Sequence, residues 1–126
     1  MTDDMTESGK KLQKELNSGT SALVLLIVLA RSKEPMYGYQ IAKLIDSRDR
    51  GIPMMKQGAL YPVLRSLEAG GLLESTVDPS VSGPPRRYYH ITPLGRRTLT
   101  EGGGIWRRTK NFVDGILEGG GHDRIG

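Results

Sequence analysis

The sequence predicts a mostly helical fold that carries one small β-hairpin. Three observations predict it. Residues 22–30 form an unbroken apolar run, later segments repeat apolar residues three and four positions apart, and only one stretch has strand-type composition around a turn. A chain of 126 residues suits a single domain with one hydrophobic core.

The first expected helix contains the apolar run "ALVLLIVLA" and extends to about Arg31. Thr20 or Ser21 can serve as its N-cap. Because the run is apolar on all sides, we expect this helix at the centre of the core. The run is too short to span a bilayer, which takes about 20 residues. The polar segment 1–17 is expected to be flexible, with a helical turn or two in "KKLQKEL".

Two shorter helices are expected next, over about residues 37–48 and 56–69. Pro35 separates the first of them from the apolar run, and two glycines end the second. The second has an inner stripe of four aliphatic residues, which are Leu60, Val63, Leu64 and Leu67. Its opposite face carries Gln57, Tyr61 and Arg65.

The period then changes from helical to strand-like. The segments "LLESTVD" and "RRYYHIT" are short, rich in β-branched and aromatic residues, and flank the turn sequence "PSVSGPP". This pattern predicts a β-hairpin with a longer loop. A last helix should follow over 93–118, with Thr92 as N-cap and Pro93 at its first position, before a flexible tail at 119–126.

Charge and cysteine content narrow the possible functions. The net charge is +4, and residues 86–110 contain one acidic residue against seven basic ones: Arg86, Arg87, Arg96, Arg97, Arg107, Arg108 and Lys110. A polyanionic partner is therefore permitted. The absence of cysteine excludes disulfides and thiolate chemistry, and it fits a reducing compartment. We expect a soluble cytoplasmic protein.

The order of three helices, a hairpin and a final helix predicts a winged helix-turn-helix unit over residues 18–92. In such units one helix reads base edges in the major groove while flanking parts hold phosphates. Gln57, Tyr61 and Arg65 would then face DNA, although a solvated helix face is the alternative. Arg86 and Arg87 suit phosphate oxygens or a narrow minor groove, although exposed hairpin tips are often charged for other reasons.

Four segments together resemble the PadR-type transcriptional regulators. They are "GTSALVLLIVLA", "MYGYQIAKLI", "KQGALYPVLRSLEAGGLL" and "GPPRRYYHITPLGRR", and the resemblance covers residues 18–117. It implies a repressor that is a homodimer, with the C-terminal helix of one copy packed against the other. The short C-terminal part resembles the short branch of the family.

The resemblance also implies the DNA-binding residues. Carried over by position, the set comprises Tyr37, Tyr39, Lys56, Gln57, Gly58, Tyr61, Pro62, Arg65, Arg86 and Arg87. One of the two tyrosines of the "YGY" segment should pack inside the protein while the other touches the DNA backbone. Gly58 has a physical role as well, because a residue without a side chain lets a phosphate approach the helix start.

The C-terminal helix carries the expected dimerisation residues, which are Ile105, Trp106, Phe112, Val113, Ile116 and Leu117. Trp106 has two interpretations. It is either an anchor of the dimer core or a platform for a small aromatic or amphipathic effector. The second interpretation is what the resemblance to the family implies, because one multidrug-responsive branch has a tryptophan at the matching position.

Three glycines, Gly102 to Gly104, depart from the family pattern, which has good helix-forming residues at these positions. Each glycine destabilises a helix interior by about 1 kcal/mol relative to alanine. Three outcomes are open. The helix persists because dimer packing holds it, it kinks at the glycines, or the missing side chains leave room for the partner subunit or a ligand beside Trp106.

No residue pattern indicates an enzyme, a cofactor site or a metal site. His90 stands alone in a strand and His122 lies in the glycine-rich tail, without the spacing of metal ligands. The leading hypothesis is therefore a ligand-responsive repressor, a homodimer on a pseudo-palindromic operator in double-stranded DNA. The alternative is a winged-helix module that binds another protein and has no operator of its own.

Overall fold

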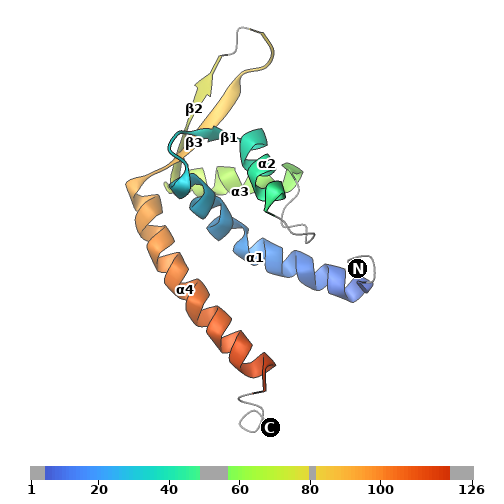
Figure 1. Ribbon diagram of the computed structural model, residues 1–126. Coiled ribbons are helices and arrows are strands. Elements are labelled where there is room, and N and C mark those ends of the chain that lie inside the picture. Colours follow the sequence, from blue (N-terminus) through green and yellow to red (C-terminus); the bar gives the residue numbers. More distant parts are fainter. Residues whose placement is uncertain (1–4, 49–56, 80–81, 120–126) are drawn as a thin grey trace.

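Four helices and three strands make up the part of the chain that the computed structural model describes, residues 5–48, 57–79 and 82–119 (Figure 1). In chain order they are α1 (Glu7–Arg31), β1 (Met36–Tyr37), α2 (Gly38–Ser47), α3 (Gln57–Ala69), β2 (Leu73–Asp78), β3 (Arg86–Ile91) and α4 (Pro93–Leu117). The expected mostly helical fold with a small β-hairpin is confirmed.

The core lies where α1, α2 and α3 meet the inner face of the sheet. Its largest fully buried side chains come from four elements and are Leu25, Ile41, Leu60, Leu64 and Leu73. Burial of each such aliphatic side chain contributes roughly 1.5–3 kcal/mol. The central place expected for the apolar run is confirmed, because Leu25, Leu26 and Leu29 are all buried.

The expected start of the first helix is wrong. Helix α1 begins at Glu7, and the hydroxyl of Thr6 caps it by accepting a hydrogen bond from the Gly9 amide at 2.9 Å. Residues 7–17, expected within a flexible segment, are therefore helical. The Thr20 and Ser21 hydroxyls do not cap a helix. They donate back to the carbonyls of Leu16 and Ser18, an alternative open to Ser and Thr inside a helix.

The sheet has one strand more than the hairpin predicts. Its order is β1-β3-β2 with both pairs antiparallel, and β1 pairs Met36 with Tyr89 and Tyr37 with Tyr88. Helix α2 starts directly after β1, where the Gln40 side chain accepts a hydrogen bond from the Tyr37 amide at 3.0 Å. The short strand therefore ties the start of α2 to the base of the hairpin.

A compact junction joins the hairpin to α4. The Thr92 hydroxyl donates to the Gly71 carbonyl at 2.7 Å and accepts from the Gly95 amide at 3.0 Å, so the expected N-cap is confirmed. The Thr92 amide donates to the Leu72 carbonyl at 3.0 Å. A Cβ atom at Gly95 would collide with that same carbonyl oxygen and would lie 2.6 Å from Ile91 Cγ1. The start of α4 thus has no room for a side chain at position 95.

Helix α4 runs without interruption through its three glycines. Gly102 faces α1, and a Cβ there would lie 3.2 Å from Leu23 Cδ1. Of the outcomes left open by the sequence, the helix therefore persists, whereas packing by a second copy and the close approach of a partner or a ligand stay predictions.

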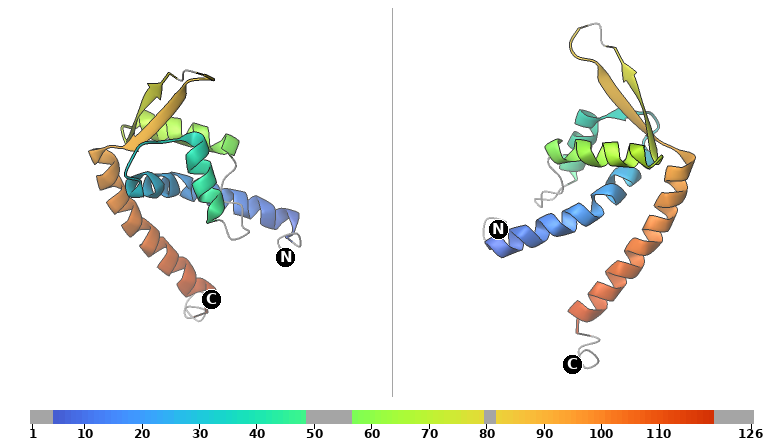
Figure 2. Two further views of the ribbon diagram at one scale, coloured as in Figure 1. Left: turned by 45° about the horizontal axis from the view of Figure 1, so that its top comes forward. Right: turned by 180° about the vertical axis from the view of Figure 1, so that it is seen from behind.

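Helices α1 and α4 approach each other near the hairpin base and then diverge, as both views in Figure 2 show. From its junction with α4, the β2–β3 hairpin extends away from the direction in which α4 runs (Figures 1 and 2). Within the described residues, no helix is both long and apolar enough to cross a membrane.

Candidate nucleic-acid interface

A shallow cavity of about 560 Å³ lies between the face of α3, the start of α2 and the arm of the hairpin. Five of the residues named by the sequence line it, which are Tyr37, Tyr61, Arg65, Arg86 and Arg87. They come from three elements, β1, α3 and β3, which lie far apart in the chain. The fold therefore gathers three guanidinium groups and two phenols around one concave surface.

Arg86 is held by aromatic side chains. Its guanidinium carbon lies 4.5 Å from the centre of the Tyr37 ring, a cation–π distance, and the Tyr37 ring meets Tyr88 edge-on at 5.3 Å. A hydrogen bond with Tyr88 and attraction to Tyr37 raise the pKa of Arg86 above its ordinary value. Arg86, which is always charged, therefore has a defined position in the lining of the cavity.

The two tyrosines of the "YGY" segment have different surroundings. Tyr37 is half-buried among Tyr39, Tyr88 and Arg86. Tyr39 is 49% exposed, with the Lys43 ammonium 5.6 Å from its ring centre. Tyr37 is thus the tyrosine that packs. The DNA-backbone contact expected for the other tyrosine stays a prediction.

Gly38 allows Tyr61 to lie close against α2. A Cβ atom at position 38 would come within 2.5 Å of Tyr61 Cε1 and 2.6 Å of its hydroxyl oxygen. The Tyr61 ring is half-buried in this contact, with Pro62 and Gly58 exposed beside it on α3. Gln57 opens α3, but its side chain lies outside the described residues, as does Lys56.

Arg87 belongs to a second set of contacts, and the sequence did not reveal them. Its Nη1 donates to Ser75 Oγ at 2.9 Å, and Ser75 Oγ donates to Glu68 Oε2 at 2.6 Å. Glu68 also lines the cavity, where burial and the Glu68 charge raise the pKa of Tyr89. The only sequence signal for Glu68 was its position one helical turn after Arg65, on the same face of α3.

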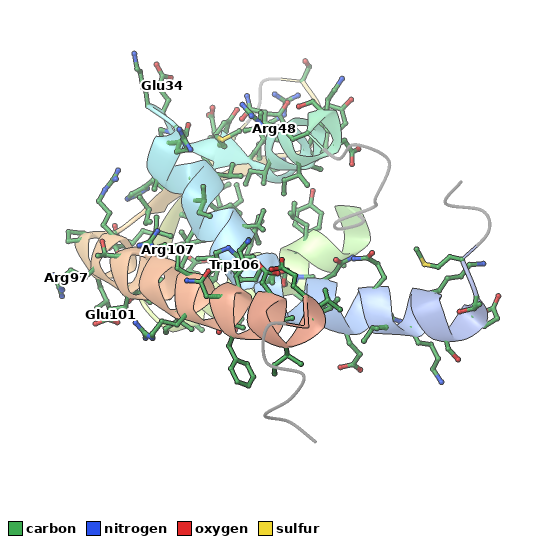
Figure 3. The ribbon with its side chains drawn as sticks, turned by 60° about the horizontal axis from the view of Figure 1, so that its bottom comes forward. Glu34, Arg48, Arg97, Glu101, Trp106 and Arg107 are labelled. Atoms are coloured by element: carbon green, nitrogen blue, oxygen red, sulfur yellow. The ribbon has the colours of Figure 1, made fainter. Side chains whose placement is uncertain are left out.

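The expected dimerisation residues are exposed along α4. Trp106 is 43% exposed, Phe112 69% and Leu117 78%, and Ile105, Val113 and Ile116 are exposed as well. Figure 3 shows Trp106 and Arg107 projecting from the middle of α4, while Arg97 and Glu101 lie nearer to its start. Such a row of large apolar side chains is unusual for a solvated surface and typical of an interaction face.

The described residues contain no group of three or more potential metal ligands. His90 Nε2 lies 3.1 Å from Glu74 Oε1 across the β2–β3 pair, so the two side chains form a cross-strand pair. His122 lies outside the described residues.

A comparison with known families decides what kind of protein carries this surface. The model of the transcriptional regulator PadR-like family matches residues 25–101, more than half of the chain. The chain belongs to the PadR-like family. It is a transcriptional regulator, and the winged helix-turn-helix assignment is confirmed.

The PadR-like chain also resembles individual proteins. A solved PadR family regulator from Eggerthella lenta is 37% identical, with a TM-score of 0.71 over 86% of this chain and 91% of that one. An uncharacterised protein from Lysinibacillus sphaericus is 31% identical over 98 residues, 78% of this chain and 87% of that protein. A transcriptional regulator from Mycobacterium tuberculosis is 54% identical over 44 residues, 35% of this chain and 40% of that protein.

Proposed function

We propose that this PadR-like regulator is a ligand-responsive repressor that binds a pseudo-palindromic operator as a homodimer. The observation that carries the proposal is the cavity between α3 and the hairpin, where Arg65, Arg86 and Arg87 converge. Three cations on one concave surface attract a phosphate backbone, and they release its counterions on binding. The α3 face beside them has the size and shape that enter a major groove.

The residues around the cavity divide into two roles. Arg65 projects from the exposed face of α3, where an arginine can bond the O6 and N7 atoms of guanine. Arg86 and Arg87 lie on the hairpin and bond phosphate oxygens, which fixes the position of α3 in the groove. The Tyr61 hydroxyl, which lies close to Gly38, bonds a phosphate between the two.

The homodimer rests on the apolar face of α4. Phe112, Ile116 and Leu117 are exposed in the single chain, and a second copy of the same helix would remove them from water. A two-fold dimer would present two α3 helices about 34 Å apart, the spacing of successive major grooves on one side of DNA. The operator should then be pseudo-palindromic, because its two half-sites meet identical surfaces.

Selection from a random-sequence DNA library tests the operator proposal. The full chain should enrich duplexes with two inverted half-sites about 10 base pairs apart, centre to centre. Analytical ultracentrifugation should find two chains on each selected duplex. If no sequence is enriched relative to a shuffled library, the operator proposal is contradicted, and the alternative of a winged-helix module that binds another protein is favoured. One chain per duplex would contradict the homodimer.

The effector site is proposed beside Trp106, in the space that two α4 helices enclose. The ring is partly exposed, and Gly103 and Gly104 precede it on the same helix without bulky side chains. A planar aromatic compound can stack on such a ring. An effector releases DNA only if it binds the DNA-free arrangement of the dimer more tightly than the DNA-bound one.

Trp106 is the single tryptophan, so its fluorescence reports on this site alone. Titration with a planar dye such as proflavine, without DNA, should quench the emission in a saturable way. An aliphatic amphiphile of similar charge serves as the control and should leave the emission unchanged. Calorimetry on Trp106→Ala should then show at least a tenfold weaker dye affinity, the loss of a stacking contact of about 1.4 kcal/mol. Equal dye binding by this variant would refute the stacking role.

A further inference from the structure

Three side chains from three elements form one continuous hydrogen-bonded relay. Glu68 lies on α3, Ser75 on β2 and Arg87 on β3. Glu68 Oε2 accepts from Ser75 Oγ at 2.6 Å, and Ser75 Oγ accepts from Arg87 Nη1 at 2.9 Å. The relay therefore connects the helix that carries Arg65 to both strands of the hairpin.

The chemistry of the three groups fixes the direction of every hydrogen bond. A guanidinium can only donate, and a carboxylate can only accept. The single hydroxyl proton of Ser75 must therefore point at Glu68, which leaves the serine lone pairs toward Arg87. The Glu68 charge also strengthens the polarity of the hydroxyl that Arg87 meets. Ser75 thus holds one N–H of Arg87 and leaves the other donors of the guanidinium for a ligand.

The adjacent Arg86 is held by a different set of contacts. Its guanidinium lies over the Tyr37 ring, and its raised pKa has the Tyr88 hydrogen bond as its main cause. No contact of the Glu68–Ser75 pair with Arg86 is found among the described residues. Of the two hairpin arginines, a change at Ser75 should therefore affect only Arg87, which makes Arg86 an internal reference.

We propose that Glu68 and Ser75 are positioning residues for DNA binding, which act by holding the Arg87 guanidinium toward the phosphate backbone and by fixing the hairpin relative to α3. The inference rests on the proposed operator binding and adds to it two residues that do not touch DNA. An arginine side chain loses rotamer freedom when it binds, at a cost of up to about 2 kcal/mol. A partner that restricts the side chain beforehand reduces this cost.

Ser75→Ala is the cleanest test because it removes the relay without changing any charge. Substitution of Glu68 would remove a negative charge beside the DNA and would strengthen binding for an unrelated electrostatic reason. Ser75→Ala should weaken binding to the selected duplex by about tenfold, as expected from one modest hydrogen bond in each of two protomers. Ser75→Thr keeps a hydroxyl on a strand residue and should restore most of the affinity. Thr76→Ala, the exposed neighbour in β2, is the matched control.

Double-mutant cycles separate positioning from a general effect on the fold. In an Arg87→Ala background, Ser75→Ala should weaken binding by less than about twofold. Ser75 acts through Arg87, so the effects of the two substitutions on the binding free energy do not add. In an Arg65→Ala or Arg86→Ala background, it should keep its full effect. The melting temperature of each variant is measured at one protein concentration.

Two results would overturn the inference. One is a Ser75→Ala variant that binds as tightly as the original protein. The other is an equal loss with and without Arg87, which would mean that Ser75 acts through the fold. Both leave the proposed operator binding intact, provided the arginine substitutions themselves weaken it. Failure of the full chain to select any duplex would instead contradict the operator proposal.

Discussion

Gly95→Ala is expected to lower the free energy of unfolding by about 3 kcal/mol, the upper part of the range for inserting a methyl group into a packed site. The new Cβ would collide with the Leu72 carbonyl oxygen and press on Ile91. The carbonyl cannot move away freely, because it accepts the Thr92 amide hydrogen bond at 3.0 Å. A shift there would loosen both the helix cap and the link between hairpin and α4.

Gly115→Ala provides the control in the same helix. Within the described part of the chain, nothing beyond the adjoining helix backbone lies within 4 Å of a Cβ at position 115, so this variant should be as stable as the original chain or slightly more so. Thermal unfolding followed by circular dichroism should place the Gly95→Ala midpoint about 10 °C or more below the Gly115→Ala midpoint. All samples need equal protein concentration, since a dimer gains stability by mass action. Equal midpoints would contradict the close packing at position 95.

Replacement of Arg65, Arg86 and Arg87 by alanine together should weaken binding to the selected duplex by at least about 1,000-fold near 0.15 M salt. A dimer would lose six guanidinium groups. Even about 1 kcal/mol for each would exceed that factor. Arg86 and Arg87 supply four of these groups to phosphates in a dimer, so the slope of log K against log salt should become shallower by about four. The fold should survive, because all three side chains are exposed.

The matched control removes three positive charges elsewhere. Lys10, Lys11 and Lys14 are exposed near the start of α1. That end of the helix lies far from the hairpin (Figures 1 and 2). Their replacement by alanine should change the affinity by less than about threefold, because salt screens charges beyond about 8 Å. Mobility shift and fluorescence anisotropy measure both variants. Undiminished binding by the arginine variant would show that DNA does not contact this surface.

The helices and the hairpin could be predicted because each depends on local signals. The inner stripe of α3 placed Leu60, Leu64 and Leu67 correctly in the core. The Thr-Pro pair at 92–93 marked the start of α4, where a threonine cap and a proline both fit. Five of the predicted DNA-binding residues meet in one cavity, although their contact with DNA stays a prediction.

Three features could not be predicted, because they depend on residues far apart in the chain or on residues with two possible roles. Strand β1 has two residues, and it exists because β3, about 50 positions later, offers a free edge. Thr20 and Ser21 can cap a helix or bond back within one, and the sequence does not distinguish these uses. The Glu68–Ser75–Arg87 relay joins three elements, so its hydrogen bonds cannot be predicted from the spacing of these residues along the chain.

Helix α4 crosses α1 where Gly102 faces Leu23, and a change in the crossing angle moves the far end of α4. Its short arm, from Pro93 to the crossing, is fixed at the hairpin by the Thr92 junction, and its long arm extends about 22 Å from Gly102 to Leu117 at 1.5 Å per residue. A rotation of about 5° at the crossing displaces the end of the long arm by about 2 Å over that length. In the proposed homodimer, the size of the side chains at positions 23 and 102 would therefore set the angle at which the apolar end of α4 meets the second copy.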